Sequence, residues 1–372
     1  MKVIIAAAGT GGHINPGIAI ANKIKEKNKE AKIIFVGTVR GLENDLVPRA
    51  GYELKTIEAY GISRQISIEN FKKIIKTIKG LKQAKRLIKQ ENPDIVIGTG
   101  GYICGPIMMA ATKQEIPTML HESNAFPGVT VKMLSKKVDE ILVGFEDAKE
   151  RLPHAKKVVL TGNPIKIRKL DLTETKKNQI RVELGFDSTL PMVLVFGGSQ
   201  GAQAINNSLI KIIKNKLNKN YQIMWAAGPK QYDQIKETLS EEGISIHNIP
   251  NVKIVPYIYN MEEVMNVCDM VVSRSGAMTI TEISRIGKPA IFIPYPFAAE
   301  NHQEYNAKVL EKIGAAKIIL NKDLDETILS ETIEEMIKDT NKLKQMGEKA
   351  ESIKVENVED KIYSEIEEIL KI

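Results

Sequence analysis

The sequence predicts an α/β protein made of two doubly wound domains. Short apolar runs rich in β-branched residues alternate along the chain with longer amphipathic segments. Strands that are apolar almost throughout indicate parallel sheets covered by helices on both faces. The chain has 372 residues, more than one hydrophobic core ordinarily serves. The runs form two series, and each begins with a strand that leads into a glycine-rich turn.

The first half contains six predicted strands. The first, VIIAAA (3–8), leads directly into the turn GTGGH (9–13). A signal peptide begins similarly, but this apolar run is shorter than an h-region of about 7–15 residues, so we interpret it as a strand. The remaining runs are KIIFVGT (32–38), DIVIGTG (94–100), PTMLHES (117–123), EILVG (140–144) and KVVLTG (157–162).

The second half repeats this plan. Its runs are MVLVFGG (192–198), QIMWAAG (222–228), VKIVPYI (252–258), DMVVSRSG (269–276), PAIFIPY (289–295) and AAKIIL (315–320). A polar stretch bounded by prolines separates the two series. We therefore predict a first domain at 1–163, a linker at 164–190, a second domain at 191–355 and a C-terminal helix at 356–372 that packs back on the first domain. Ligands of such sheets bind beyond the carboxyl ends of the strands, so we expect the domains to face a cleft.

The positive charge lies in the first half of the chain. Residues 1–165 carry 26 basic against 16 acidic side chains, whereas the rest carries 27 against 30. The segment 69–90 alone holds eight basic residues and one acid, with apolar residues at helical spacing. We expect a helix whose basic face, including Lys72, Lys73, Lys76 and Lys79, contacts an anionic membrane surface. Nucleic acid is not expected, because no recognition motif or interleaved aromatic residues accompany the charge.

Cysteine and histidine spacing indicates neither a disulfide framework nor a metal site. The two cysteines, Cys104 and Cys268, lie far apart, as is usual in a reducing cytoplasm. The five histidines show no HExxH spacing, and we interpret the pair Asp323 and Asp325 as an N-cap cluster. No apolar run approaches the roughly 18 residues of a membrane-spanning helix.

Two glycine-rich turns in the second half predict a nucleotide diphosphate site. GGSQGA (197–202), with the hydroxyl of Ser199, and RSGAM (274–278) each follow a strand and open a helix. Such turns present backbone N–H groups to an anion, and Glu282 can accept both hydroxyls of a ribose. A nicotinamide dehydrogenase is disfavoured, because Ile14 occupies the third glycine position of GxGxxG and the second strand ends FVGT, with no acid there to bind a ribose.

His13 is the candidate general base. It lies at the start of the first helix, where the helix dipole disfavours a second positive charge, so a neutral ring there can accept a proton from a substrate hydroxyl. A capping role is the alternative for His13, and Glu122 and Glu300 compete for the role of base. Asn124, in HESNAFPG (121–128), is suited to bind a sugar hydroxyl or amide.

Seven motifs together resemble those of the MurG family of lipid-linked N-acetylglucosaminyltransferases in order and spacing. They are GTGGHINPG (9–17), GTGGYICGP (98–106), HESNAFPG (121–128), TGNP (161–164), GGSQGA (197–202), SRSGAMTITE (273–282) and NHQEYNA (301–307). The resemblance covers residues 1 to about 320. It implies a GT-B fold and an inverting transfer with no cofactor and no essential metal. N-acetylglucosamine would pass from UDP-N-acetylglucosamine to the C4 hydroxyl of an undecaprenyl-diphosphate-linked N-acetylmuramyl-pentapeptide, at the cytoplasmic side of the cell membrane.

The resemblance also implies which residues bind the donor. It places Thr10, Gly11, Gly12, Asn124 and Ser199 on the donor, the backbone of Ile258 on uracil, Ala277, Met278, Thr279, Ile280 and Thr281 on the diphosphate, Glu282 on the ribose and Gln303 on the sugar. Lys166 stands where many relatives carry an arginine, with Arg168 two residues later. A lysine can bind phosphate there, as a point charge rather than a planar fork.

Two other functions remain open. One is a different UDP-sugar enzyme of the same fold, such as a UDP-N-acetylglucosamine 2-epimerase or a diacylglycerol glycosyltransferase. The other is a nucleotide-sugar-binding membrane scaffold without turnover. Conversion of the donor in the absence of acceptor would indicate the epimerase, and full cellular function of His13→Ala would indicate the scaffold.

Overall fold

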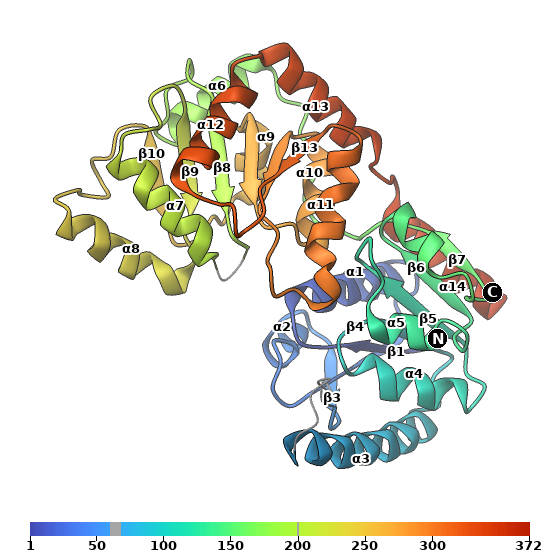
Figure 1. Ribbon diagram of the computed structural model, residues 1–372. Helices are drawn as coiled ribbons and strands as arrows, with labels where there is room; N and C mark the ends of the chain where they lie inside the picture. The colour runs from blue at the N-terminus through green and yellow to red at the C-terminus, as the bar shows by residue number, and fades with distance from the viewer. Residues whose placement is uncertain (60–67, 199–200) are drawn as a thin grey trace. The chain divides into compact units, whose positions relative to one another are not determined.

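The computed structural model describes residues 1–59, 68–198 and 201–372, and for residues 68–78 it describes the backbone alone. The chain forms two compact units (Figure 1). Unit 1 contains Met1–Ile165 and Val355–Ile372, and unit 2 contains Lys166–Lys354. The segment 164–190, expected as a linker, belongs mostly to unit 2, where it contributes helix α6 (Glu174–Glu183).

Unit 1 is built on a parallel sheet with the strand order β3-β2-β1-β4-β5-β6-β7. Its strands are β1 (Lys2–Ala7), β2 (Lys32–Gly37), β3 (Glu53–Thr56), β4 (Ile95–Gly100), β5 (Thr118–Glu122), β6 (Glu140–Val143) and β7 (Val158–Leu160). Its helices are α1 (Gly11–Lys27), α2 (Glu43–Arg49), α3 (Ile68–Glu91), α4 (Cys104–Thr112), α5 (Val129–Leu134), the 3₁₀ helix η1 (Glu146–Arg151) and α14 (Val358–Leu370). Strand β3 was not predicted from the sequence, because ELKT is a short polar edge strand with no apolar run.

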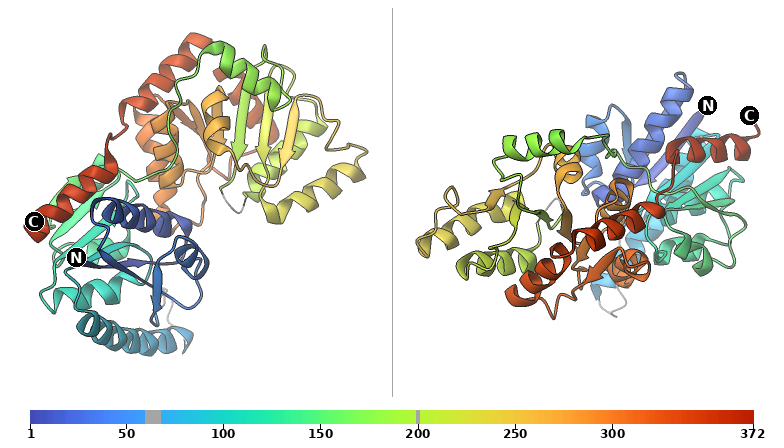
Figure 2. Two further views of the ribbon diagram at one scale, coloured as in Figure 1. Left: turned by 180° about the vertical axis from the view of Figure 1, so that it is seen from behind. Right: turned by 90° about the horizontal axis from the view of Figure 1, so that it is seen from above.

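Alternate residues of the unit 1 strands enter two separate cores, as the two-residue period of a strand requires. Ile4 and Ala6 of β1 pack with α4 and the end of α3, whereas Val3 and Ile5 pack with α1 and α14. Helix α14 therefore covers the same face of the sheet as α1, and the two helices lie side by side in both figures (Figures 1 and 2).

Helix α3 is amphipathic over the part whose side chains the structure describes. Ala84 and Ile88 are fully buried. The basic side chains of the same part are exposed, and they are Lys79, Lys82, Lys85, Arg86 and Lys89. Lys79 forms an ion pair with Glu58, with 2.5 Å between its Nζ and Glu58 Oε1. Lys72, Lys73 and Lys76 lie on the same helix, but their side chains are outside the described part of the chain.

Unit 2 is built on a second parallel sheet, with the order β10-β9-β8-β11-β12-β13. Its strands are β8 (Met192–Phe196), β9 (Gln222–Ala226), β10 (Val252–Val255), β11 (Met270–Ser273), β12 (Ala290–Phe292) and β13 (Ala316–Ile318). Besides α6, its helices are α7 (Gln203–Lys214), α8 (Pro229–Glu241), α9 (Met261–Val267), α10 (Ala277–Ile286), the 3₁₀ helix η2 (Ala299–Asn301), α11 (His302–Lys312), α12 (Glu326–Ile337) and α13 (Thr340–Ser352). All six strands predicted for the second half are therefore present. In the described residues of both units, no helix is long and apolar enough to cross a bilayer.

Candidate active site

The strand order of unit 1 reverses direction between β1 and β4, and His13 lies at this switch point. In open α/β sheets, ligands bind where the strand order reverses, beyond the carboxyl ends of the strands. After β1 the chain passes through Gly9, at φ +96°, and Thr10 is the N-cap of α1. The first turn of α1 therefore places Gly11, Gly12 and His13 at the carboxyl edge of the sheet. The N–H of His13 donates to the carbonyl oxygen of Thr10 at 3.0 Å.

The imidazole of His13 is oriented by two backbone contacts. Its Nδ1 lies 3.1 Å from the carbonyl oxygen of Ala8. A carbonyl only accepts hydrogen bonds, so Nδ1 carries the hydrogen and the basic lone pair of the neutral ring lies on Nε2. The ring also lies directly against Gly100, where a Cβ atom would come within 2.3 Å of His13 Cδ2. In this tautomer Nε2 is the ring atom that can accept a proton.

The end of β5 places Glu122 and Asn124 at the same edge of the sheet. Glu122 is buried, and its carboxylate accepts hydrogen bonds from the backbone N–H of Asn124 at 2.8 Å, the Asn124 side chain at 3.0 Å and the N–H of Gly128 at 2.8 Å. Burial raises the pKa of Glu122, although these hydrogen bonds act in the opposite direction. Both carboxylate oxygens are therefore engaged in shaping the 122–128 loop, which weakens the case for Glu122 as the base.

His121 is a contrasting histidine in the same unit. Its side chain is buried, and its Nε2 lies 3.1 Å from the carbonyl oxygen of Gly162. Burial lowers the pKa of His121 to about 4. His121 is thus a neutral core residue that links β5 to the chain after β7, whereas His13 is half-buried at the carboxyl edge of the sheet.

The strand order of unit 2 reverses between β8 and β11, and the second and third glycine-rich turns meet there. After β8, Gly198 and Gly201 take positive φ values of +89° and +78°. A Cβ atom on Gly201 would lie 2.3 Å from the carbonyl oxygen of Ala227, so the turn approaches the end of β9 closely. Ser199, predicted to bind the donor, lies outside the described residues.

Asn206 holds the start of α7 against β9, a contact that was not predicted from the sequence. Its side-chain nitrogen donates to Ala227 O at 2.8 Å, and its side-chain oxygen accepts from the indole N–H of Trp225 at 2.9 Å. Asn206 and Trp225 are both buried. The asparagine therefore fixes where α7 begins relative to β9, and nothing in the local sequence distinguishes it from a surface residue.

The turn after β11 caps α10 and contacts the start of α11. Gly276 is the N-cap of α10, and Ser275 Oγ donates to the backbone oxygen of Gln303 at 2.8 Å. The side-chain oxygen of Gln303 accepts a hydrogen bond from the N–H of Tyr295 at 2.9 Å. The side-chain nitrogen of Gln303 can therefore act as a donor to another group. The first two turns of α10 carry the predicted diphosphate and ribose residues Ala277, Met278, Thr279, Ile280, Thr281 and Glu282.

Burial changes the pKa of the Glu282 carboxyl group in unit 2. Desolvation raises its pKa to about 7. A carboxyl held in this way gains from a ligand that donates hydrogen bonds to its ionised form. The observation fits the expected contact with two ribose hydroxyls.

Other predicted residues take different positions. Ile258 is buried after β10, between the exposed Tyr257 and Tyr259, whose rings contact each other edge to face at 5.1 Å. Lys166 and Arg168 are both exposed, and the backbone of Arg168 is held by Glu262 at 2.9 Å. Asp325 caps α12 by accepting from the N–H of Ile328 at 2.7 Å, which confirms the N-cap interpretation.

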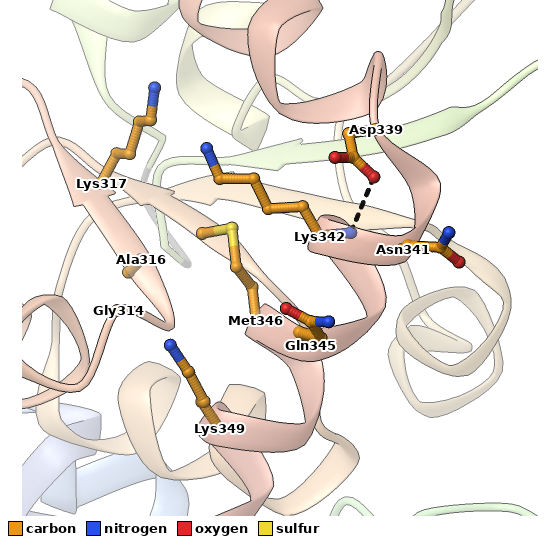
Figure 3. Close-up of a pocket in the computed structure, with 9 residues that line it drawn as sticks. All are labelled: Gly314, Ala316, Lys317, Asp339, Asn341, Lys342, Gln345, Met346 and Lys349. Carbon is orange, nitrogen blue, oxygen red and sulfur yellow. Dashed lines mark hydrogen bonds between the residues drawn. The ribbon is translucent and has the colours of Figure 1, made fainter.

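A hollow of about 530 Å³ in unit 2 lies away from these residues, between β13 and α13 (Figure 3). Lys317, Lys342 and Lys349 surround it. None of the residues predicted to bind the donor lines this hollow. In the described residues, no group of three or more His, Cys, Asp or Glu side chains is arranged to hold a metal ion.

Comparison with known proteins identifies the family of this chain. The glycosyltransferase family 28 N-terminal domain matches residues 3–143, and the family 28 C-terminal domain matches residues 192–362. A relative from Acetivibrio thermocellus, a UDP-N-acetylglucosamine–N-acetylmuramyl-(pentapeptide) pyrophosphoryl-undecaprenol N-acetylglucosamine transferase, is 44% identical over 372 residues and is matched over 99% of its length. The crystal structure of Acinetobacter baumannii MurG superposes with a TM-score of 0.79 at 26% identity, over 99% of each chain.

A further structure shows only that the fold is widespread. UDP-GlcNAc 2-epimerase from Neisseria meningitidis has a TM-score of 0.67 at 16% identity, over 99% of this chain and all of its own. The 44% sequence identity with the transferase from Acetivibrio thermocellus, over the full length of the chain, distinguishes it from this epimerase, which is 16% identical. The chain is therefore a glycosyltransferase with the GT-B fold, and it belongs to family 28 and, within that family, to the MurG family.

Proposed function

We propose that this enzyme transfers N-acetylglucosamine from UDP-N-acetylglucosamine to the C4 hydroxyl of undecaprenyl-diphospho-N-acetylmuramyl-pentapeptide, with His13 as the general base. The substrates follow from the names of relatives that match the chain over its whole length. The observation that carries the role of His13 is its position at the switch point of unit 1, with Nδ1 directed to Ala8 O. Nε2 is then the atom that receives the proton.

The reaction is a single displacement. The C4 oxygen of the acceptor forms a bond to the anomeric carbon as its proton passes to His13 Nε2, and the bond from that carbon to the phosphate oxygen breaks. Attack opposite the leaving group inverts the configuration. UDP departs with the electron pair, and the N-terminus of α10 stabilises the charge that develops on the diphosphate.

Unit 2 supplies the donor contacts that this mechanism needs. The backbone of Ile258 meets uracil, Glu282 accepts hydrogen bonds from the ribose hydroxyls, and the 277–281 segment and Ser199 hold the diphosphate. The side-chain nitrogen of Gln303 donates to the sugar. The hydrogen bond from Tyr295 N–H to the side-chain oxygen of Gln303 supports this role, because it fixes which end of the amide is the donor. The motifs alone support the assignment of five further residues to the donor, which are Thr10, Gly11, Gly12, Asn124 and Lys166.

The exposed basic face of α3 supports attachment of the enzyme to the membrane surface. Lys82, Lys85, Arg86 and Lys89 project from a helix whose opposite side is buried. Each basic residue near anionic headgroups contributes about 1 kcal/mol to binding. An acceptor with a polyprenyl tail stays in the bilayer, so we propose peripheral attachment on the cytoplasmic side.

The test measures transfer of labelled N-acetylglucosamine to a short-chain analogue of the lipid acceptor, in the presence of a chelator. We expect product at the full rate, and a loss of about 10²–10⁴-fold in kcat for His13→Ala. His154→Ala, which changes an exposed histidine of the same unit, serves as the control. A small loss in His13→Ala with an unchanged pH–rate profile would overturn the role of His13, and conversion of the donor without acceptor would indicate an epimerase.

A further inference from the structure

Glu43, the first residue of α2, is a fully buried carboxylate with no part in the motifs described above. Its Oε1 accepts the backbone N–H of Thr38 at 2.8 Å and the Thr38 hydroxyl at 2.7 Å. Its Oε2 accepts the N–H of Gly9 at 2.9 Å. Burial by itself would raise the pKa of Glu43, but the hydrogen bonds from Gly9 and Thr38 outweigh it and lower the pKa. The carboxylate is therefore ionised at neutral pH.

The chain around Glu43 is built to admit it. A Cβ atom on Gly37 would lie 2.5 Å from Glu43 Cγ, and one on Gly41 would lie 1.9 Å from Glu43 Oε2. Two glycines thus leave room for one carboxylate. Burying a charge is costly unless hydrogen bonds compensate it, and the three hydrogen bonds from Gly9 and Thr38 supply that compensation at Glu43.

One peptide group joins Glu43 to His13. The N–H of Gly9 donates to Glu43 Oε2, and the carbonyl of the same peptide, on Ala8, accepts from His13 Nδ1. The order of groups is therefore carboxylate, peptide N–H, peptide C=O and imidazole Nδ1–H. Hydrogen bonds in such a chain polarise one another, so the carboxylate makes the Ala8 oxygen a stronger acceptor.

We propose that Glu43 is a positioning residue that acts on His13 through the Ala8–Gly9 peptide. It holds Gly9 at its positive φ, fixes the ring with hydrogen on Nδ1, and strengthens Nε2 as a base. This arrangement performs with a peptide in the middle what a carboxylate directly on a histidine performs in a catalytic triad. The inference rests on the proposed role of His13 as the base.

Other titratable groups near this edge do not substitute for Glu43. Glu122 at the end of β5 hydrogen-bonds its own loop. The thiol of Cys104 is neutral, because burial raises its pKa to about 12. Arg40 lies on the loop before α2 and is exposed. Glu43→Gln leaves all three in place. It removes the charge and turns an amide nitrogen toward the N–H of either Gly9 or Thr38, so its effect reports on the charge together with one of these hydrogen bonds.

The experiment compares Glu43→Gln, Glu43→Asp and a control, Asp139→Asn, in the transfer assay across pH. Asp139 also accepts the N–H and hydroxyl of one threonine, Thr118, at 3.0 and 2.8 Å, but at the opposite end of the sheet. For Glu43→Gln we expect kcat to fall about 10–100-fold, the range found for residues that orient a metal-ligating histidine. The acidic limb of the pH–rate profile should move to lower pH, because a weaker base at His13 is protonated only at lower pH. Glu43→Asp should retain part of the rate, and Asp139→Asn should keep the parent profile.

A measurement on the unaltered enzyme covers the case in which Glu43→Gln does not fold. Selective ¹⁵N labelling of histidine reports the tautomer of His13, and we expect hydrogen on Nδ1. A ring with hydrogen on Nε2 would overturn the proposal. So would a folded Glu43→Gln enzyme with the parent kcat and pH profile. If instead His13→Ala retains the parent rate, the proposed base itself fails, which is a distinct outcome.

Discussion

Gly100→Ala tests whether the position of the His13 ring controls the rate. A Cβ atom on Gly100 would lie 2.3, 2.7 and 2.9 Å from Cδ2, Cγ and Nε2 of His13. Carbon atoms in contact sit about 3.5–4.0 Å apart, so the ring must shift by about 1 Å or more. A misplacement of about 1 Å costs a catalytic group roughly 10²-fold in rate. We expect kcat to fall by about that factor.

The variant also strains the backbone, and this effect has to be separated from the first. Gly100 has φ +131°, which costs a residue with a side chain about 1–3 kcal/mol of stability. Gly51→Ala is the matched control, because Gly51 lies in the same unit at φ +84° with no atom within 4 Å of the added Cβ. Both variants should lower the midpoint of thermal unfolding, and only Gly100→Ala should lower kcat.

The double variant His13→Ala, Gly100→Ala gives the sharpest form of the test. If the substitution of Gly100 acts by displacing the His13 ring, it should have no further effect when the ring is absent. The double variant should then have the same kcat as His13→Ala alone. The assay is the initial rate of N-acetylglucosamine transfer at saturating donor, with binding of UDP measured in parallel. A folded Gly100→Ala enzyme with the parent kcat would refute the reasoning.

Three further predictions follow from the charged groups. Burial raises the pKa of Glu282 to about 7, and only the ionised carboxylate accepts both ribose hydroxyls, so the affinity for UDP, measured by calorimetry, should rise with pH through that value. Burial, and then the neighbouring Glu365 carboxyl, raise the pKa of Glu140 to about 8. The folded-state pKa lies above the unfolded value, so unit 1 should lose stability as pH rises toward 8, and Glu140→Gln should reduce that loss in thermal unfolding. Charge reversal at Lys82 and Lys85 should weaken binding to anionic vesicles by at least about 1 kcal/mol for each lysine reversed, because each change removes an attracted charge and adds a repelled one.

Each of these predictions has a control or a contradicting result. Glu282→Gln should bind UDP weakly and without pH dependence, and an unchanged dependence would assign the titration to another group. If Glu140→Gln and the parent enzyme lose stability equally as pH rises toward 8, the prediction for Glu140 is contradicted. Reversal of Lys230 and Lys236, exposed on α8 of unit 2, matches the change in charge and should leave vesicle binding intact.

The sequence alone predicted the features that depend on neighbouring residues. A strand, a glycine turn and a helix follow one another within about 20 residues, so the turns at His13 and Gly276 could be read from the order of residue types. The amphipathic pattern of α3 and the cap at Asp325 are local in the same sense. The two sheets followed from the count and the apolar character of the strands, although β3 was missed because its four residues are mostly polar.

Tertiary structure alone decided how residues far apart in the chain support the site. Glu43 lies 34 residues from Gly9, and Asn206 lies 19 residues from Trp225. No local pattern marks either pair, because each depends on which strands become neighbours. The tautomer of His13 likewise depends on the carbonyl that its turn brings beside Nδ1. The sequence determined which groups are available for the chemistry, and the pairing of β1 with β2 and β4 determined which of them act together, because hydrogen bonds require atoms to meet within about 3 Å.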